Sequence, residues 1–248
     1  MFDLLKNKLD PGRPDTPSLL LTQEDPITFM GSKRNEKRLW YPPAIQFPKR
    51  MKRVWIHPDG YTRALLIHFN AGRHNPLNTM QGGINNGYMY DAMGPDGVIH
   101  QANPLNEAGY HCGGGKWKGP DGKLYSPMHK YMRGIEITSA GKLDKNGKSW
   151  FGVTIPEDKI REVKAGGSIR EGGKYEKYTD AQEKSLLNYI LWLKWNNEAV
   201  FNFDWVIGHE ECSIQKTDPG GALSMDMATY RKYLKMKYAE LLKVKGLA

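Results

Sequence analysis

The stretch "TRALLIHFNAG" (62–72) is a compact apolar run that ends in Asn-Ala-Gly. An apolar run of this kind, bounded by turn residues, predicts a short buried β-strand. His68 lies where the run gives way to the glycine-containing loop. Because a side chain at the end of a rigid strand is well placed to contribute to a site, the stretch predicts both a core strand and a candidate functional histidine.

Three further stretches predict strands around this one. Residues 87–102 predict a hairpin, because Pro-Asp-Gly at 95–97 separates two segments with apolar residues. Residues 131–141 predict a strand in which Glu136 and its apolar neighbours lie on opposite sides. Residues 201–208 predict a fourth strand, which ends at a second histidine.

Two stretches predict helices. Residues 179–196 begin with a capping box, with Thr179 at the N-cap and Gln182 at the third helical position, and continue with a broad apolar face. Residues 226–244 place tyrosines and leucines on one side and lysines on another. Strands followed by helices that cover one face predict an α/β or α+β layer domain. The Lys- and Gly-rich residues 142–178 predict a long surface loop.

The composition limits the class of protein. The chain has 248 residues, enough for one large domain, and no run of 18 or more apolar residues, so no transmembrane helix is expected. Its net charge of +9 favours an anionic partner. No nucleic-acid-binding motif occurs, and we expect no specific nucleic-acid partner. Cys112 and Cys212 are expected to be free buried thiols, with a single disulfide as the alternative.

The first 53 residues differ from the rest of the chain. The first 50 hold seven of the fifteen prolines and several basic clusters, which predicts an irregular basic extension (1–53) wrapped on a domain spanning 54–248. The N-terminus lacks the apolar segment of a signal peptide, so we expect synthesis in a cytoplasm without the usual export signal.

The stretch "GHEECSIQKTDPGG" (208–221) brings His209, Lys216 and Asp218 into one loop. Alone, Asp-Pro-Gly predicts an ordinary turn with solvated side chains. With His68, however, His209 and Asp218 offer two imidazoles and a carboxylate, a set that leaves a zinc ion one open position for water. Such a zinc ion suits hydrolysis of an amide. Lys216 could then stabilise developing negative charge, and Glu136 could move the proton, unless it is an outward-facing strand residue.

Six stretches occur together in a recognisable order: "LLIHFNAG", "GYMYDAMGPDGVIHQ", "AGYHCG", "RGIEITSAG", "YTDAQ" and "GHEECSIQKTDPGG". In these stretches the chain from about 60 to 225 resembles the zinc-dependent N-acetylmuramoyl-L-alanine amidases. This family includes phage amidase-type lysozymes, cytosolic muropeptide-recycling amidases and peptidoglycan-recognition proteins. The resemblance implies a mixed central β-sheet flanked by helices, with zinc in a cleft. The implied reaction is hydrolysis of the amide between N-acetylmuramic acid and the L-alanine of the stem peptide.

The resemblance also implies roles for individual residues. The implied zinc ligands are His68, His209 and Asp218, the implied catalytic residues are Glu136, Lys216 and Tyr88, and the implied substrate-binding residues are His111 and Asn70. Tyr90 is the alternative to Tyr88, because the spacing to the following Asp-Gly is one residue longer than in the family.

The expected partner is bacterial peptidoglycan, and the expected setting is phage-mediated lysis after holin-dependent release. The basic extension and the C-terminal helix are candidates for contact with anionic envelope polymers or a membrane surface. The alternatives are a peptidoglycan-binding module without activity, a cytosolic recycling amidase and a toxin delivered into rival bacteria. The presence of all three candidate ligands, Lys216 and Glu136 favours catalysis over binding alone.

Overall fold

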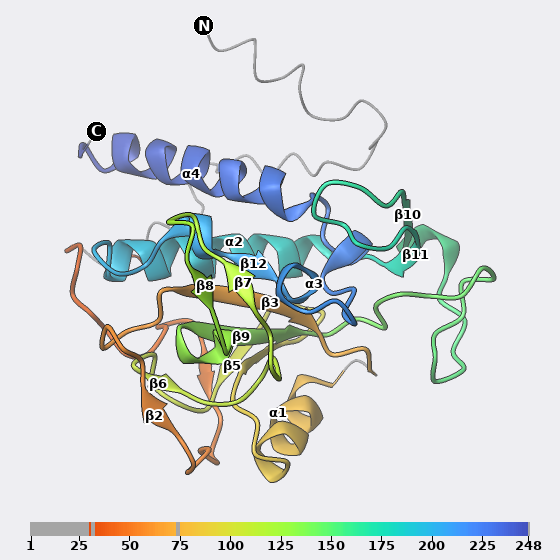
Figure 1. The fold of residues 1–248 in the computed structure, drawn as a ribbon, viewed down its shortest axis with the longest axis horizontal. Coiled ribbons are helices and arrows are strands. Elements are labelled where there is room, and N and C mark those ends of the chain that lie inside the picture. The colour runs from red at the N-terminus through yellow and green to blue at the C-terminus, as the bar shows by residue number, and fades with distance from the viewer. Residues whose placement is uncertain (1–29, 31–32, 73–74, 248) are drawn as a thin grey trace, which may run out of the picture.

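The computed structural model describes residues 30, 33–72 and 75–247. Its centre is a six-stranded sheet with the strand order β1-β5-β4-β9-β3-β12 (Figure 1). These strands are β1 (Ile45–Gln46), β5 (Ile99–Gln101), β4 (Asp91–Met93), β9 (Met132–Ile137), β3 (Ala64–Phe69) and β12 (Ile207–Gly208). Neighbouring strands are parallel except for the β4–β5 hairpin. The sheet is therefore mixed, and the predicted fold class is confirmed.

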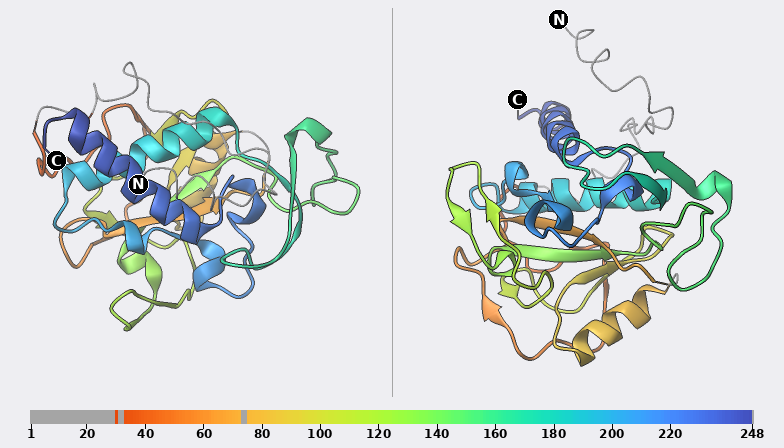
Figure 2. Two further views of the ribbon diagram at one scale, coloured as in Figure 1. Left: turned by 90° about the horizontal axis from the view of Figure 1, so that it is seen from above. Right: turned by 45° about the vertical axis from the view of Figure 1, so that its right-hand side comes forward.

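Helices cover both faces of the sheet. Helix α1 (Pro76–Asn85) lies on one face, whereas α2 (Asp180–Asn196) lies on the other, with α4 (Met227–Val244) outside it (Figures 1 and 2). The predicted capping box at Thr179 is confirmed. Helix α2 is buried on nearly all sides because it lies between the sheet and α4. We did not predict α1, whose sequence "PLNTMQGGIN" contains two glycines and few apolar residues.

Shorter elements complete the domain. They are β2 (Trp55–Ile56), β6 (Glu107–Ala108), β7 (Trp117–Lys118), β8 (Leu124–Tyr125), α3 (His209–Cys212) and the 3-10 turns η3 (Met128–Lys130), η4 (Glu157–Lys159), η5 (Phe203–Trp205) and η6 (Gly220–Ala222). The strand predicted for 201–208 is wrong in its first part. There the side chain of Asn202 accepts a hydrogen bond from the Asp204 amide and caps η5, so only β12 is extended sheet.

The prediction of a long surface loop for 142–178 is also wrong in part. This segment contains an antiparallel hairpin of β10 (Ile160–Val163) and β11 (Gly173–Glu176). Val163, Ile169 and Tyr175 form a small buried cluster against Phe69 of β3, which fixes the hairpin to the sheet. Residues 142–156 project from the body beside it (Figure 1).

Part of the predicted N-terminal extension, residues 1–29 and 31–32, lies outside the described residues. Within residues 33–53, strand β1 pairs in parallel with β5 and forms one edge of the central sheet. The backbone of Met51 also exchanges two hydrogen bonds with the side chain of Asn103. The described part of the extension therefore belongs to the same folded unit as the sheet.

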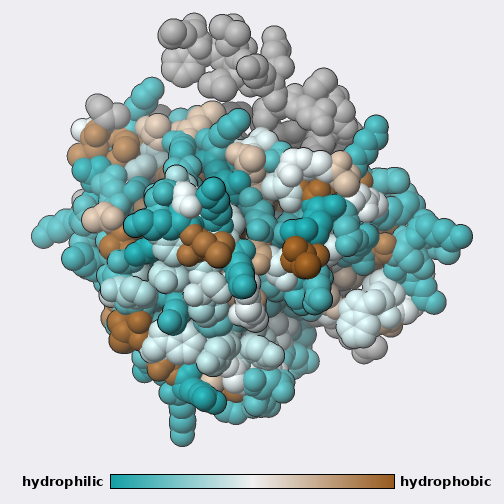
Figure 3. Space-filling model, in the orientation of Figure 1, coloured by the Kyte–Doolittle hydropathy of each residue, from teal (hydrophilic) through white to brown (hydrophobic). Residues whose placement is uncertain are grey.

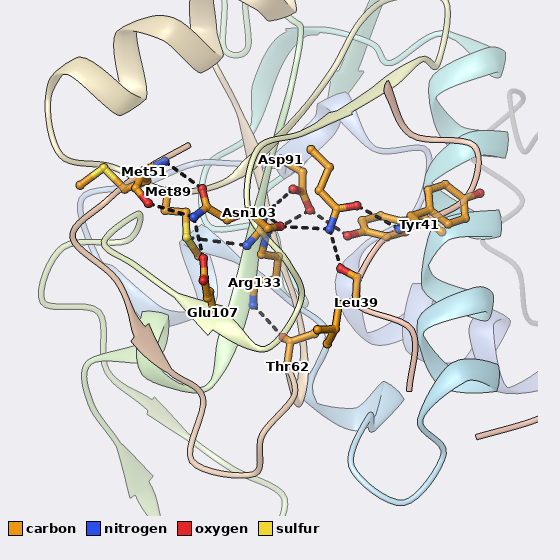
Figure 4. A network of polar contacts seen from close by, with 11 residues as sticks. Leu39, Tyr41, Met51, Thr62, Met89, Asp91, Asn103, Glu107 and Arg133 are labelled. Atoms are coloured by element: carbon orange, nitrogen blue, oxygen red, sulfur yellow. Dashed lines mark hydrogen bonds and ion pairs between the residues drawn. The ribbon is translucent and has the colours of Figure 1, made fainter. Parts of the chain in front are cut away.

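A buried polar network joins this segment to the sheet and to α2 (Figure 4). Arg133 of β9 and Asp91 of β4 form an ion pair of 2.6 Å with fully buried side chains. The Tyr189 hydroxyl of α2 donates to Asp91, and Arg133 also donates to the Asn103 carbonyl. Each charge is matched by groups of the protein itself, so the network holds the layers together.

Within the described residues, no helix is both long and apolar enough to cross a membrane. The face seen in Figure 3 is largely hydrophilic, with hydrophobic residues in small separate groups.

Candidate metal centre and active site

Three neighbouring strands place three of the predicted site residues side by side. In the register of β3 and β9, His68 lies opposite Glu136. In the register of β3 and β12, Ile67 lies opposite Gly208, so His209 follows directly beside His68. The parallel arrangement thus brings side chains from distant parts of the chain to one edge of the sheet, as we expected for strand ends.

Asp218 reaches this edge from the loop after α3. Glu210 holds the loop at two points: its amide donates to the Asp218 carbonyl, and its carboxylate accepts from the Gly220 amide. Gly208 allows the close approach, because a Cβ atom there would lie 2.4 Å from Pro219 Cδ. The "KTDPGG" segment is therefore a turn packed against the strand that carries His209.

The side chains of His68, His209 and Asp218 converge on one point. The two Nδ1 atoms lie 3.0 Å apart, and Asp218 Oδ2 lies 3.0 Å from that of His68 and 3.1 Å from that of His209. All three residues are buried. Within the described residues, these three form the group whose donor atoms lie close enough together to share a metal ion.

The spacing and chemistry of these donors fit a tetrahedral metal ion. With metal–nitrogen bonds of about 2.0–2.1 Å, tetrahedral donor atoms lie about 3.3 Å apart, close to the observed separations. Two imidazoles and one carboxylate suit zinc and leave a fourth position open. The residues present are therefore compatible with a catalytic zinc site.

His111 fixes the tautomer of His68. The Met132 carbonyl can only accept a hydrogen bond, so His111 Nε2, 3.0 Å away, must donate. In a neutral imidazole, Nδ1 of His111 then accepts, and its partner at 3.1 Å, His68 Nε2, must donate. This leaves the His68 Nδ1 lone pair facing His209 and Asp218, as a metal ligand requires. We predicted a substrate-binding role for His111. Both of its ring nitrogens are engaged inside the protein, and the residue also lines the large cavity described below.

The environment favours the deprotonated forms that bind metals. Burial, reinforced by the charge of His209, lowers the pKa of His68 to about 4. Burial lowers the pKa of His111 well below its ordinary value, with a further contribution from His68. Burial alone would raise the pKa of Asp218, but its interactions with the neighbouring His209 and His68 outweigh this and hold the pKa below its ordinary value. At neutral pH the cluster therefore offers the neutral imidazole of His68 and the carboxylate of Asp218.

Glu136 has the opposite shift. Burial, followed by the charge of Asp218, raises the pKa of Glu136 well above its ordinary value, and Lys216 opposes this only in part. A buried carboxyl group with a raised pKa can take up and release a proton during a reaction, which is the property of a general acid or base.

A cavity of about 820 Å³ opens beside these residues. Its lining combines site residues with cationic side chains: Tyr88, Tyr90, His111, Glu136, His209, Lys216, Lys116 and Arg170. We did not predict Lys116 or Arg170, because they lie in loops without a distinguishing pattern. Cys112 and Cys212 also line the cavity and are buried and free, so the expectation of free buried thiols is confirmed.

The structure distinguishes the two candidate tyrosines. The Tyr90 hydroxyl donates to the Thr79 carbonyl at 2.9 Å, which commits it to α1. Tyr88 lines the cavity with 47% of its surface exposed. Tyr88 is therefore the more accessible of the two to a ligand in the cavity.

Asn70 lies apart from the large cavity. Its amide nitrogen donates to the Thr79 hydroxyl, and its oxygen accepts from the amides of Gly72 and Ser139. The side chain shapes the loop after β3 and lines a second, smaller cavity.

No family model and no curated protein matches the sequence. Among solved structures, a selenomethionine derivative of AmpD is similar, with 19% identity, a TM-score of 0.48 and coverage of 80% of this chain and 97% of that one. The endolysin amidase LysCS from Clostridium intestinale has 13% identity and a TM-score of 0.47, with coverage of 79% of this chain and 95% of that one. The amidase AmiD from E. coli, in complex with its muropeptide substrate, has 15% identity and a TM-score of 0.44, with coverage of 65% of this chain and 53% of that one. These are similarities of overall fold.

Proposed function

We propose that this protein is a zinc-dependent N-acetylmuramoyl-L-alanine amidase. The observation that carries the proposal is the convergence of His68, His209 and Asp218, within 3.1 Å of one another, at the edge of a cavity lined by Glu136 and Lys216. The six ordered motifs support the same assignment. A module that only binds peptidoglycan would need neither the converging ligands nor a carboxyl group beside them.

The residues have complementary roles in the proposed hydrolysis. His68, His209 and Asp218 would hold the zinc ion, whose chemistry there would be polarisation of the scissile carbonyl and a lowering of the pKa of water to about 7. Glu136 takes a proton from the attacking water and returns one to the leaving nitrogen. The Lys216 ammonium stabilises the negative charge that develops on the carbonyl oxygen. Tyr88, at the cavity wall, is placed to orient the substrate.

Mass spectrometry of digested, purified sacculi tests this function. We expect free stem peptides that begin with L-alanine and glycan strands of unchanged length. Cleaved glycan bonds or cleaved peptide cross-links, without free stem peptides, would contradict the proposal.

Removal of the metal tests the cofactor separately. A chelator should abolish release of stem peptides, and added zinc should restore it. Full activity in the metal-free protein, checked by elemental analysis, would exclude a catalytic metal. The mass spectrometry of digested sacculi would still decide which bond is cleaved.

We further propose that the protein acts in phage-mediated lysis on the intact envelope. The net charge of +9 and the exposed lysines 232, 235 and 243 of α4 favour adhesion to anionic envelope polymers. The alternative is a recycling enzyme, which would act on soluble muropeptides. Comparison of initial rates on sacculi and on isolated muropeptides separates the two, and adhesion to sacculi should weaken as salt is raised.

A further inference from the structure

A second cavity of about 380 Å³ continues from the first. Glu136 and Tyr90 line both cavities, so the two meet at the proposed proton-transfer group. The second cavity runs along α1 and the described residues that precede it, Asn70, Gly72 and Asn75. A ligand that reacts beside Glu136 can therefore extend in two directions.

The two cavities differ in charge. The larger one carries the cationic groups of Lys116, Arg170 and Lys216, which outnumber its two carboxyl groups, Glu211 and the shared Glu136. Apart from the shared Glu136, the described residues that line the smaller one are uncharged, and Asn70, Asn75, Asn78 and Thr79 offer amide and hydroxyl groups. We call this second cavity the amide groove. Its chemistry suits a neutral, hydroxyl-rich ligand better than a charged peptide.

Helix α1 leaves room in the amide groove. Gly83 packs directly on Tyr90, since a Cβ atom there would lie 2.3 Å from the tyrosine hydroxyl. A Cβ atom at Gly82 would meet nothing within 4 Å. The missing side chain at Gly82 thus leaves open space between the helix and the amide side chains.

Trp150 adds an aromatic surface next to the amide groove. It is 76% exposed, yet its indole N–H donates to the Ala71 carbonyl, between the groove residues Asn70 and Gly72. The segment that carries Trp150 has its own small core, formed by Ala140, Leu143, Ile155, Phe151 and Ile160. An exposed indole that is held in place offers a flat apolar face at little entropic cost to a ligand.

We propose that the amide groove and Trp150 bind the glycan strand, and that the cationic cavity binds the acidic stem peptide. Pyranose rings have apolar faces that can pack on an indole, whereas their hydroxyl and acetamido groups can bond with the asparagine amides. The scissile amide joins the sugar to the peptide, so the sugar-binding and peptide-binding cavities must meet at the reacting bond. The two cavities meet at Glu136. This inference rests on the proposed amidase function and specifies how its substrate is oriented.

Binding of an uncharged sugar tests the inference without any hydrolysis. A β-1,4-linked N-acetylglucosamine tetramer is titrated into the full-length protein, with zinc and after chelation, and followed by calorimetry. We expect binding in both states, at least tenfold weaker binding by Trp150→Ala, and an intermediate effect of Trp150→Phe. Asn78→Ala should weaken binding several-fold.

Leu124→Ala is the matched control, since Leu124 is 69% exposed on β8 and lies outside both cavities. It should bind the tetramer as the wild type does. Absence of wild-type binding at millimolar sugar, or equal binding by Trp150→Ala with an unchanged melting temperature, would overturn the inference. Neither result depends on amide cleavage, which the sacculus digest decides.

Discussion

Two buried polar clusters lie on the same sheet, and they differ in how their charges are matched. In the network of Arg133 and Asp91, the protein supplies both the cation and the anion (Figure 4). In the cluster of His68, His209 and Asp218, three atoms that could serve as metal ligands face one another. Among the ion pairs of the described residues, Asp218 is matched only by the two histidines. Burial of charge therefore does not identify a site, whereas convergence of ligand atoms does.

The largest expected effect is loss of activity when the converging cluster is broken. Asp218→Ala removes the only carboxylate of the three ligands, and we expect loss of bound zinc and at least about a thousandfold lower activity. Elemental analysis and release of stem peptides from sacculi measure the two effects. Asp121→Ala, which removes an exposed carboxylate on another loop, is the control. Retention of zinc by Asp218→Ala would show that a different residue completes the site.

Breaking the matched network should instead affect stability. Arg133→Met leaves Asp91 buried without its cation, at a cost of about 3–5 kcal/mol in the free energy of unfolding. Urea unfolding measures this, and zinc content at low temperature should stay near one ion per chain. The double variant with Asp91→Leu should recover part of the loss. If Arg133→Met lost zinc without losing stability, the two clusters would not have the separate roles that we assign to them.

A smaller effect is expected from substitution of His111, the neutral histidine that contacts the candidate metal ligand His68. His111→Phe removes the acceptor that fixes the His68 tautomer, so zinc affinity should fall by about 10–100-fold. His111→Gln, whose side-chain oxygen can accept the same hydrogen bond, should recover part of it. Competition with a zinc-binding dye gives the affinities. Equal affinities of the wild type and His111→Phe would mean that the hydrogen bond does not orient the ligand.

Acid should destabilise the metal-free protein through buried neutral histidines. Burial lowers the pKa of His57 to about 4, although its hydrogen bond to the Lys130 carbonyl opposes the shift. Below about pH 6.5 the histidine binds a proton in the unfolded chain but stays neutral in the folded chain, so the free energy of unfolding falls as the pH drops from 6.5 towards 4. We expect His57 to contribute about 2 kcal/mol of this loss by pH 5.

Urea midpoints at pH 7 and pH 5 measure this effect. His57→Gln, which can still donate to the Lys130 carbonyl, should show a shallower dependence on pH. An unchanged slope in that variant would place the acid sensitivity in other groups.

The elements that the sequence predicted well are those with local signals. Apolar runs located β3 and β9, and the capping residue Thr179 located the start of α2. Strand β1 carries no such signal, because its place in the sheet depends on pairing with β5, more than 50 residues away. The hairpin of β10 and β11 lies in a Lys- and Gly-rich segment, whose composition is typical of a loop.

The candidate site shows the same difference between features with a local sequence signal and features that depend on long-range contacts. The residue types and motif order predicted His68, His209 and Asp218 as one group, and the structure brings them together. The contact of His111 with His68 could not be predicted, because it depends on the carbonyl of Met132 on a neighbouring strand. The amide groove was missed for a similar reason, since α1 itself was not predicted.

The close contact between Gly208 and Pro219 has a consequence for how this site tolerates change. Any larger residue at 208 would push the turn outward and take Asp218 with it, although position 208 offers no ligand atom. A substitution there should therefore mimic loss of the carboxylate while leaving every chemically active side chain intact. Sequence comparisons that score only the ligands would classify such a variant as active, so an intact set of ligands is not a sufficient criterion for activity on this fold.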